Sequence, residues 1–365
     1  MKIAIKIFFV FFLSSFTTIA KSFISDTIKT PFCLEINSHL GFIIPHSDAI
    51  KNISNTNPFG IETDIYWYLI KNKDWERCNC YSKTGFSLLY IDFDNPILGS
   101  ATNISVFLEP YMSYKHRFTI SFKMGIGVSY INKIYDEITN PENFFFSSHL
   151  NFIVYLNIIA QYKINSNIDL KISANYNHIS NGGQKKPNKG MNFPTGSLGI
   201  NYTFDKIEFK NREKTPTNIN KKYFYSIETF GIIKILGESN GYDEKGTLII
   251  GLSARVSRTV SKLNALNFGL ETISDGSIKE KVKRTNQDND YHIIGTLIGN
   301  EFIFGKFNFC QQVGLYVYAP YYSDKLFFQR YSLSYKISER ILIGTTLKTH
   351  LQVADNFNIK LGYCF

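Results

Sequence analysis

Arg117-Phe-Thr-Ile-Ser-Phe-Lys-Met-Gly-Ile-Gly-Val-Ser-Tyr-Ile131 shows most clearly the alternation from which the fold can be inferred. Every second residue from Phe118 to Tyr130 is apolar, and the residues between them are Thr, Ser, Lys and Gly. Successive side chains of a β-strand point to opposite faces. The alternation therefore predicts a strand with one apolar face and one narrow, polar face.

The composition of the whole chain favours a membrane barrel. The N-terminus has two lysines, an apolar run from Ile7 to Phe16 and the small-residue pattern Thr18-Ile-Ala20, which together are typical of a secretory signal peptide. No later stretch reaches 18 consecutive apolar residues. The 365 residues include 32 Phe and 23 Tyr, and only 19% are charged. An exported, aromatic-rich chain of low charge predicts an all-β transmembrane antiparallel barrel, with a secreted β-sandwich as the alternative.

The same alternation recurs along the chain and predicts about 16 strands in two series of eight. The first series is expected near 34–44, 60–71, 83–93, 102–115, 117–131, 146–164, 168–180 and 195–204. The second is expected near 223–236, 246–258, 263–273, 289–304, 306–318, 326–337, 340–350 and 355–365. We therefore divide the chain into a signal peptide (1–20), a first β half (21–204), a polar connector (205–222) and a second β half (223–365).

Two architectures fit this division: one wide barrel, or two tandem eight-stranded barrels joined by the connector. We favour the single barrel, because hairpin addition enlarges a barrel without a second closure. The stretches 150–155 and 196–204 are echoed by 329–335 and 358–365, which indicates an internal duplication. The alternation common to all barrel strands would also give weak self-similarity.

Charge and cysteine content point to no cofactor. The net charge of +10 comes from Lys and Arg scattered through turns, so it favours anionic lipid head groups and not nucleic acid. The five cysteines show no metal-ligand spacing, and Cys78 and Cys80 are too close in sequence for an easy bridge. We expect the cysteines to have no specific role, and no metal or cofactor to be bound.

A base and a hydroxyl lie at the end of one predicted strand. Along 168–180 the apolar row Ile168, Leu170, Ile172, Ala174 and Tyr176 continues into His178 and Ser180. The two side chains are therefore expected side by side on the lipid-facing wall, where polar groups are costly. A lipid substrate would explain their position, because the imidazole could take the hydroxyl proton during attack on an ester.

At these residues the sequence resembles the PagL family of outer-membrane lipid A 3-O-deacylases, also grouped as acyloxyacyl-hydrolase-like proteins. The matching residues are His178-x-Ser180-Asn181-Gly182-Gly183, then Pro187-Asn188-x-Gly190, then the strand that ends Gly199-Ile-Asn-Tyr-Thr-Phe204. The resemblance covers roughly residues 34–204. It implies Ser180 as nucleophile, His178 as general base, and the Asn181 side chain and Gly183 N–H as oxyanion donors.

The chain departs from the family at the third catalytic position. The usual glutamate, twelve positions beyond the serine, corresponds to Asn192. Asparagine can orient the imidazole but cannot stabilise the imidazolium by charge. Three possibilities stay open: a weaker enzyme, another carboxylate in its place, or an inactive site.

The sequence thus predicts a serine esterase of the Gram-negative outer membrane that removes an ester-linked acyl chain from lipid A. Lys185, Lys186 and Lys189 are expected to meet the lipid A phosphates, or else to form an ordinary solvated loop. His350 lies at the corresponding place in the second half, but it has inward parity and no serine at the required spacing. The main alternative is a non-catalytic barrel, either a porin-like channel or a structural protein; a surface adhesin has no positive support.

Overall fold

The computed structural model describes residues 30–111, 116–205, 207, 209–213, 223–239, 241–322, 325–351 and 353–365. The predicted signal peptide and residues 206, 208 and 214–222 of the predicted connector lie outside this range.

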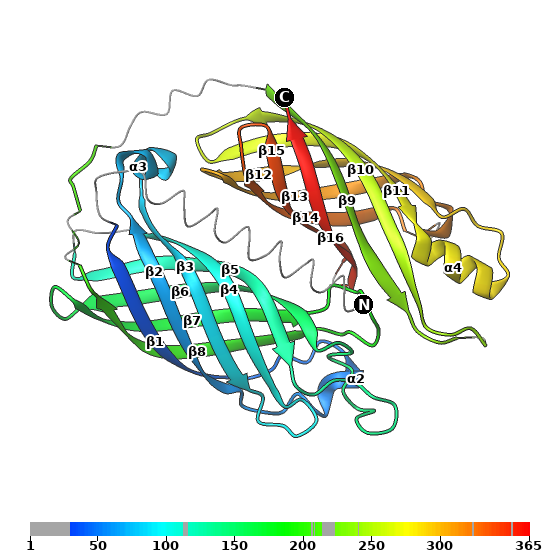
Figure 1. Ribbon diagram of the computed structural model, residues 1–365, viewed down its shortest axis with the longest axis horizontal. Helices are drawn as coiled ribbons and strands as arrows, with labels where there is room; N and C mark the ends of the chain where they lie inside the picture. Colours follow the sequence, from blue (N-terminus) through cyan, green and yellow to red (C-terminus); the bar gives the residue numbers. More distant parts are fainter. Residues whose placement is uncertain are drawn as a thin grey trace.

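In the described part of the chain, sixteen antiparallel strands form two closed barrels, drawn in Figure 1 as a blue-to-green and a green-to-red unit. The first closes where β1 pairs with β8, from Cys33↔Thr203 to Gly41↔Thr195. The second closes where β9 pairs with β16. Our preference for one wide barrel is wrong, because each eighth strand returns to the first strand of its own half. Both halves consist of hairpins of similar length, so local alternation does not show where a barrel closes.

The predicted strands are confirmed within a few residues. The first barrel comprises β1 (Phe32–Gly41), β2 (Phe59–Leu69), β3 (Tyr81–Asp92), β4 (Ser100–Tyr111), β5 (Phe118–Ile131), β6 (Leu150–Lys163), β7 (Ile168–Ser180) and β8 (Met191–Thr203), with short helices α2 (Asp48–Lys51) and α3 (Asn72–Cys78) in its loops.

The second barrel comprises β9 (Tyr223–Leu236), β10 (Lys245–Thr259), β11 (Asn264–Asp275), β12 (His292–Phe304), β13 (Phe307–Tyr318), β14 (Phe327–Lys336), β15 (Ile341–His350) and β16 (Val353–Cys364), with α4 (Gly276–Thr285) and the 3-10 turn η1 (Pro320–Tyr322). In the described part of the chain, no helix is long and apolar enough to cross a membrane.

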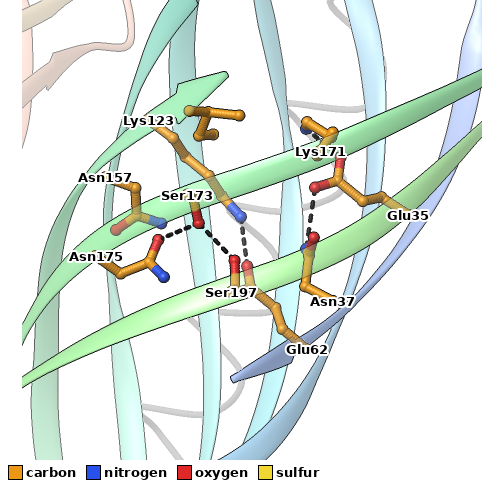
Figure 2. Close-up of a pocket in the computed structure, with 10 residues that line it drawn as sticks. Glu35, Asn37, Glu62, Lys123, Asn157, Lys171, Ser173, Asn175 and Ser197 are labelled. Atoms are coloured by element: carbon orange, nitrogen blue, oxygen red, sulfur yellow. Dashed lines mark hydrogen bonds and ion pairs between the residues drawn. The ribbon is translucent and has the colours of Figure 1, made fainter. Parts of the chain in front are cut away.

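Charged side chains fill the interior of both barrels. In the first, Lys83 pairs with Glu109 at 2.6 Å, and Lys123 contacts the carboxylates of Glu62 and Asp64. Figure 2 shows the cavity in this network, which has a volume of about 10 Å³. In the second, the pairs include Arg255–Glu228, Arg330–Glu271 and Lys360–Glu228. In the first barrel, the cavity beside Lys123 has room for about one water molecule.

The outer faces carry the apolar rows that the sequence predicts. On β7, Leu170, Ile172 and Tyr176 are exposed on the outside of the wall, whereas Asp169, Lys171 and Asn175 are buried inside. An apolar exterior around a polar interior is the arrangement that a bilayer requires of a spanning barrel.

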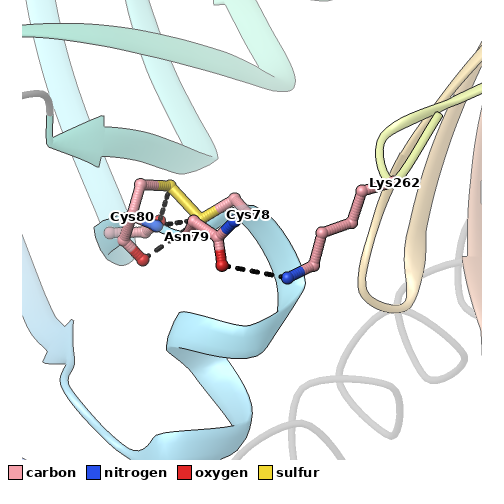
Figure 3. Close-up of a disulfide and its surroundings, with 5 residues drawn as sticks. Cys78, Asn79, Cys80 and Lys262 are labelled. Carbon is pink, nitrogen blue, oxygen red and sulfur yellow. Dashed lines mark hydrogen bonds between the residues drawn. A yellow bond between two sulfur atoms is a disulfide. The ribbon is translucent and has the colours of Figure 1, made fainter. Parts of the chain in front are cut away.

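Cys78 and Cys80 form a disulfide at the end of α3, shown in Figure 3, so our expectation that they are too close to bridge is wrong. Asn79 between them has φ 53°, a left-handed conformation that turns the chain sharply. The Cα atoms consequently lie 5.1 Å apart, within the range that a disulfide spans. The Asn79 side chain also accepts a hydrogen bond from Lys262 of the second barrel, at 3.0 Å.

Candidate active site

His178 and Ser180 end strand β7 on the outer wall of the first barrel. Both are half-buried and continue the outward row of Ile172 and Tyr176, whereas the alternate residues Asn177 and Ile179 are buried inside. The predicted parity is confirmed. A base and a hydroxyl therefore lie at the rim of the wall that faces lipid.

A hydrogen-bonded chain joins the three predicted catalytic side chains. His178 Nε2 lies 3.1 Å from Ser180 Oγ, and His178 Nδ1 lies 2.7 Å from Asn192 Oδ1. The second contact follows from the β7–β8 register, in which His178 is directly opposite Asn192. Because the amide oxygen only accepts, Nδ1 carries the proton, and Nε2 is left to accept the Ser180 proton.

No carboxylate replaces the missing acid in the part of the chain that the structure describes. The hydrogen bonds of the imidazole go to Asn192 and Ser180 alone. Of the three possibilities that Asn192 raises, substitution by another described carboxylate therefore has no contact to support it.

The turn after Ser180 is organised by Asn181, which is 1% exposed. Its Oδ1 accepts hydrogen bonds from the N–H groups of Gly183 (3.0 Å) and Gln184 (3.1 Å), and its Nδ2 donates to Lys185 O at 2.7 Å. Both predicted oxyanion donors are thus engaged inside the turn. The Gly182 N–H is directed at Ser180 Oγ, at 3.4 Å.

Residues that sequence reasoning assigned no role support this turn. Asn188 Oδ1 accepts the Asn181 N–H at 3.2 Å, and Ser147 Oγ donates to Lys185 O at 2.9 Å. Gly190 has φ +69°, and a Cβ on it would lie 3.0 Å from His178 Cε1 and 3.1 Å from Ser180 Cβ. The sequence indicated Asn188 and Gly190 only as members of the Pro-Asn-x-Gly motif. No sequence pattern pointed to Ser147.

The three loop lysines differ in their surroundings. Lys185 forms a half-exposed ion pair with Glu244 of the second barrel at 2.9 Å. Lys186 and Lys189 are exposed. The side chains of Lys186 and Lys189 are therefore more accessible than that of Lys185.

His350 ends β15 as His178 ends β7, but its imidazole Nε2 contacts Tyr316 OH at 2.7 Å, within the second barrel. Its side chain lies on the same face of β15 as the side chain of the buried Lys348. The prediction of an inward side chain is confirmed, and this contact is with a tyrosine hydroxyl, whereas the Nε2 contact of His178 is with a serine hydroxyl.

Comparisons with known proteins agree with these observations. The family model "Lipid A 3-O-deacylase (PagL)" matches residues 61–201, and the model "Acyloxyacyl hydrolase, C-terminal domain" matches residues 223–365. No curated protein matches the sequence.

Among solved structures, the outer-membrane enzyme PagL is similar, with 15% identity, 46% of this chain and 98% of that chain covered, and a TM-score of 0.31. A Rhodopseudomonas blastica porin triple mutant has 11% identity over 92% of this chain and 100% of its own, with a TM-score of 0.22. These likenesses are too distant to bear on function. The two family models, which match successive parts of the sequence, are the informative comparison: the chain belongs to the PagL family of outer-membrane lipid A deacylases, which are ester hydrolases.

Proposed function

We propose that this protein removes an ester-linked acyl chain from lipid A by serine catalysis, with Ser180 as nucleophile and His178 as general base. The observation that carries the proposal is the chain Ser180–His178–Asn192 on the lipid-facing wall, with contacts of 3.1 and 2.7 Å. A serine hydroxyl attacks an ester only when a positioned base removes its proton as the new bond forms.

The reaction has two halves. Ser180 Oγ adds to the ester carbonyl while its proton passes to His178 Nε2; the tetrahedral intermediate then expels the sugar oxygen, which takes that proton. Water next attacks the acyl-serine, again giving its proton to His178, and the fatty acid leaves as the Ser180 hydroxyl is restored. Asn192 keeps Nδ1 protonated throughout, so that Nε2 faces the serine.

Asn181 and Gly183 are proposed to stabilise the oxyanion. In the structure the Gly183 N–H donates to Asn181 Oδ1, so an oxyanion would have to replace that acceptor. The Gly182 N–H, already directed at Ser180 Oγ, could contribute a further donor. Fixed donors of this kind each contribute on the order of 3 kcal/mol to the transition state.

Lys186 and Lys189 are proposed to contact the phosphates of the lipid A disaccharide, and Lys185 to contribute only when its pair with Glu244 opens. The acyl chain would then lie along the exposed apolar row of β7 and β8, which includes Tyr176 and Leu198. Head group and chain would thus be held on opposite sides of Ser180.

Fatty acid release from purified lipid A tests the proposal, measured for the wild type, Ser180→Ala and His178→Gln. Release by the wild type, with rates at least about a thousandfold lower for both variants, is expected from the loss of nucleophile or base. Ser197→Ala, which removes a hydroxyl inside the barrel, is the matched control and retains full release. Equal release by wild type and Ser180→Ala would contradict the proposal.

A further inference from the structure

The second barrel meets the first at the turn that follows the nucleophile. Gly182, Gly183 and Gln184 touch β9 and β16, the two strands whose pairing closes the second barrel. The contacts involve main chain and aromatic rings, so they fix the path of this turn.

The pairing of β9 with β16 ends at Gly231↔Ile359, although β9 continues to Leu236. Beyond that pair, β9 runs past the turn Gly182–Gln184 of the first barrel. There the Ile235 N–H donates to Gln184 O at 2.7 Å, as it would to a neighbouring strand. The turn Gly182–Gln184 thus lies beside the β9–β16 pairing that closes the second barrel.

The two glycines of the turn allow the close approach. A Cβ on Gly182 would lie 2.4 Å from Phe357 Cβ, and one on Gly183 would lie 2.9 Å from Asp355 O. Their φ angles of +66° and +80° are also those that favour glycine. The path of the main chain next to Ser180 is therefore set against β16.

Phe357 is the central residue of this contact. Its neighbours in the outward row of β16, Ile359 and Leu361, are 47% and 53% exposed, whereas Phe357 is 8% exposed. It stacks on Phe152 of β6 with ring centroids 4.0 Å apart, and Phe152 is the residue directly opposite Ser180 in the β6–β7 register. The ring thus touches both the turn after Ser180 and the strand beside it.

We propose that the second barrel is a positioning element of the hydrolytic site: Phe357 and the Ile235 N–H hold the turn Gly182–Gln184, and with it the N–H groups next to Ser180. The inference rests on the proposed serine mechanism. It gives the second half of the chain a positioning role in the reaction. A shift of the turn by about 1 Å would move the donors away from the developing oxyanion.

The test uses the full-length protein in detergent with lipid A as substrate. Phe357→Ala is compared with Phe268→Ala, which removes an exposed ring from the outer face of the second barrel. Two rates are measured: kcat for fatty acid release, and phosphonylation of Ser180 by a small fluorophosphonate, which needs no lipid binding. We expect both rates to fall by ten- to about a hundredfold in Phe357→Ala with KM within about twofold, and neither to change in Phe268→Ala.

Two more variants separate the loss of this contact from a loss of folding. Phe357→Tyr retains the stacked ring and should retain both rates, whereas Ile235→Pro removes the N–H to Gln184 and should lower both; it serves if Phe357→Ala does not fold. An active wild type with Phe357→Ala or Ile235→Pro at unchanged rates would overturn the inference. A wild type that releases no fatty acid would instead overturn the proposed function.

Discussion

Asn192 lies where the family resemblance places an acid, and its Oδ1 lies 2.7 Å from His178 Nδ1. The Asn192 amide fixes the tautomer of the His178 imidazole, but it places no negative charge beside the imidazolium. Asn192→Glu should therefore raise kcat by roughly tenfold or more, and Asn192→Ala should lower it because the ring loses its orientation. Fatty acid release at saturating lipid A measures both effects. A fall in kcat for Asn192→Glu would show that the site is adapted to the neutral partner.

Gly190 illustrates how closely the loop packs on His178 and Ser180. A methyl group there would lie 3.0 Å from the imidazole and 3.1 Å from Ser180 Cβ, on a backbone with φ +69°. Gly190→Ala should lower kcat by about tenfold or more because the imidazole must move away from Ser180 Oγ. Gly241→Ala is the control, since that glycine also has positive φ but has open space around it in the second barrel. Full activity of Gly190→Ala would contradict the geometry of this loop.

The feature that could be predicted best is which side chains of β7 face outward. The alternation from Ile168 to Tyr176 was enough to place His178 and Ser180 on the outer wall, since strand periodicity is local. The contact between His178 and Asn192 was implied only by the family resemblance. It depends on the β7–β8 register across a long loop, which alternation does not set. The internal bonds of Asn181 were likewise invisible, because they form only once the turn Gly182–Gln184 has folded.

The loop between β7 and β8 should decide how tightly phosphorylated lipid A binds. Replacing Lys186 and Lys189 by Gln should raise KM several-fold with little change in kcat, because exposed charges attract the head group without touching the ester. Lys185→Gln alone should have a smaller effect, since that lysine is paired with Glu244. Kinetics on lipid A with and without phosphate provide the comparison. An equal rise in KM for both substrates would contradict a contact between these lysines and the phosphates.

At the scale of the whole molecule, the closure into two barrels could not be read from the sequence. It depends on pairs far apart in the chain, such as Cys33↔Thr203 and Ser226↔Cys364. The disulfide of Cys78 and Cys80 depends on the left-handed conformation of Asn79, and the stack of Phe152 on Phe357 depends on how the barrels meet. These features arise from long-range packing or from a single turn, whereas the strands arise from local pattern.

The charged side chains inside each barrel are expected to stabilise the fold. Glu109 accepts from Lys83 at 2.6 Å and from Ser121 at 2.6 Å, all of them buried. Glu109→Gln should lower the free energy of unfolding by about 3–5 kcal/mol, because it leaves a buried ammonium without its charge partner. Urea unfolding, followed by tryptophan fluorescence, measures the change, with exposed Glu339→Gln as the control. Equal stability of the two variants would contradict this view of the interior.

The central claim is that Ser180 and His178 hydrolyse an acyl ester of lipid A although the third residue is Asn192. Mass spectrometry of lipid A from Gram-negative cells that express the wild type or Ser180→Ala tests it most directly. Lipid A from wild-type cells should lack one ester-linked acyl chain, and lipid A from Ser180→Ala cells should retain it. Lipid A of the same mass in both strains, with both proteins folded in the outer membrane, would contradict the claim.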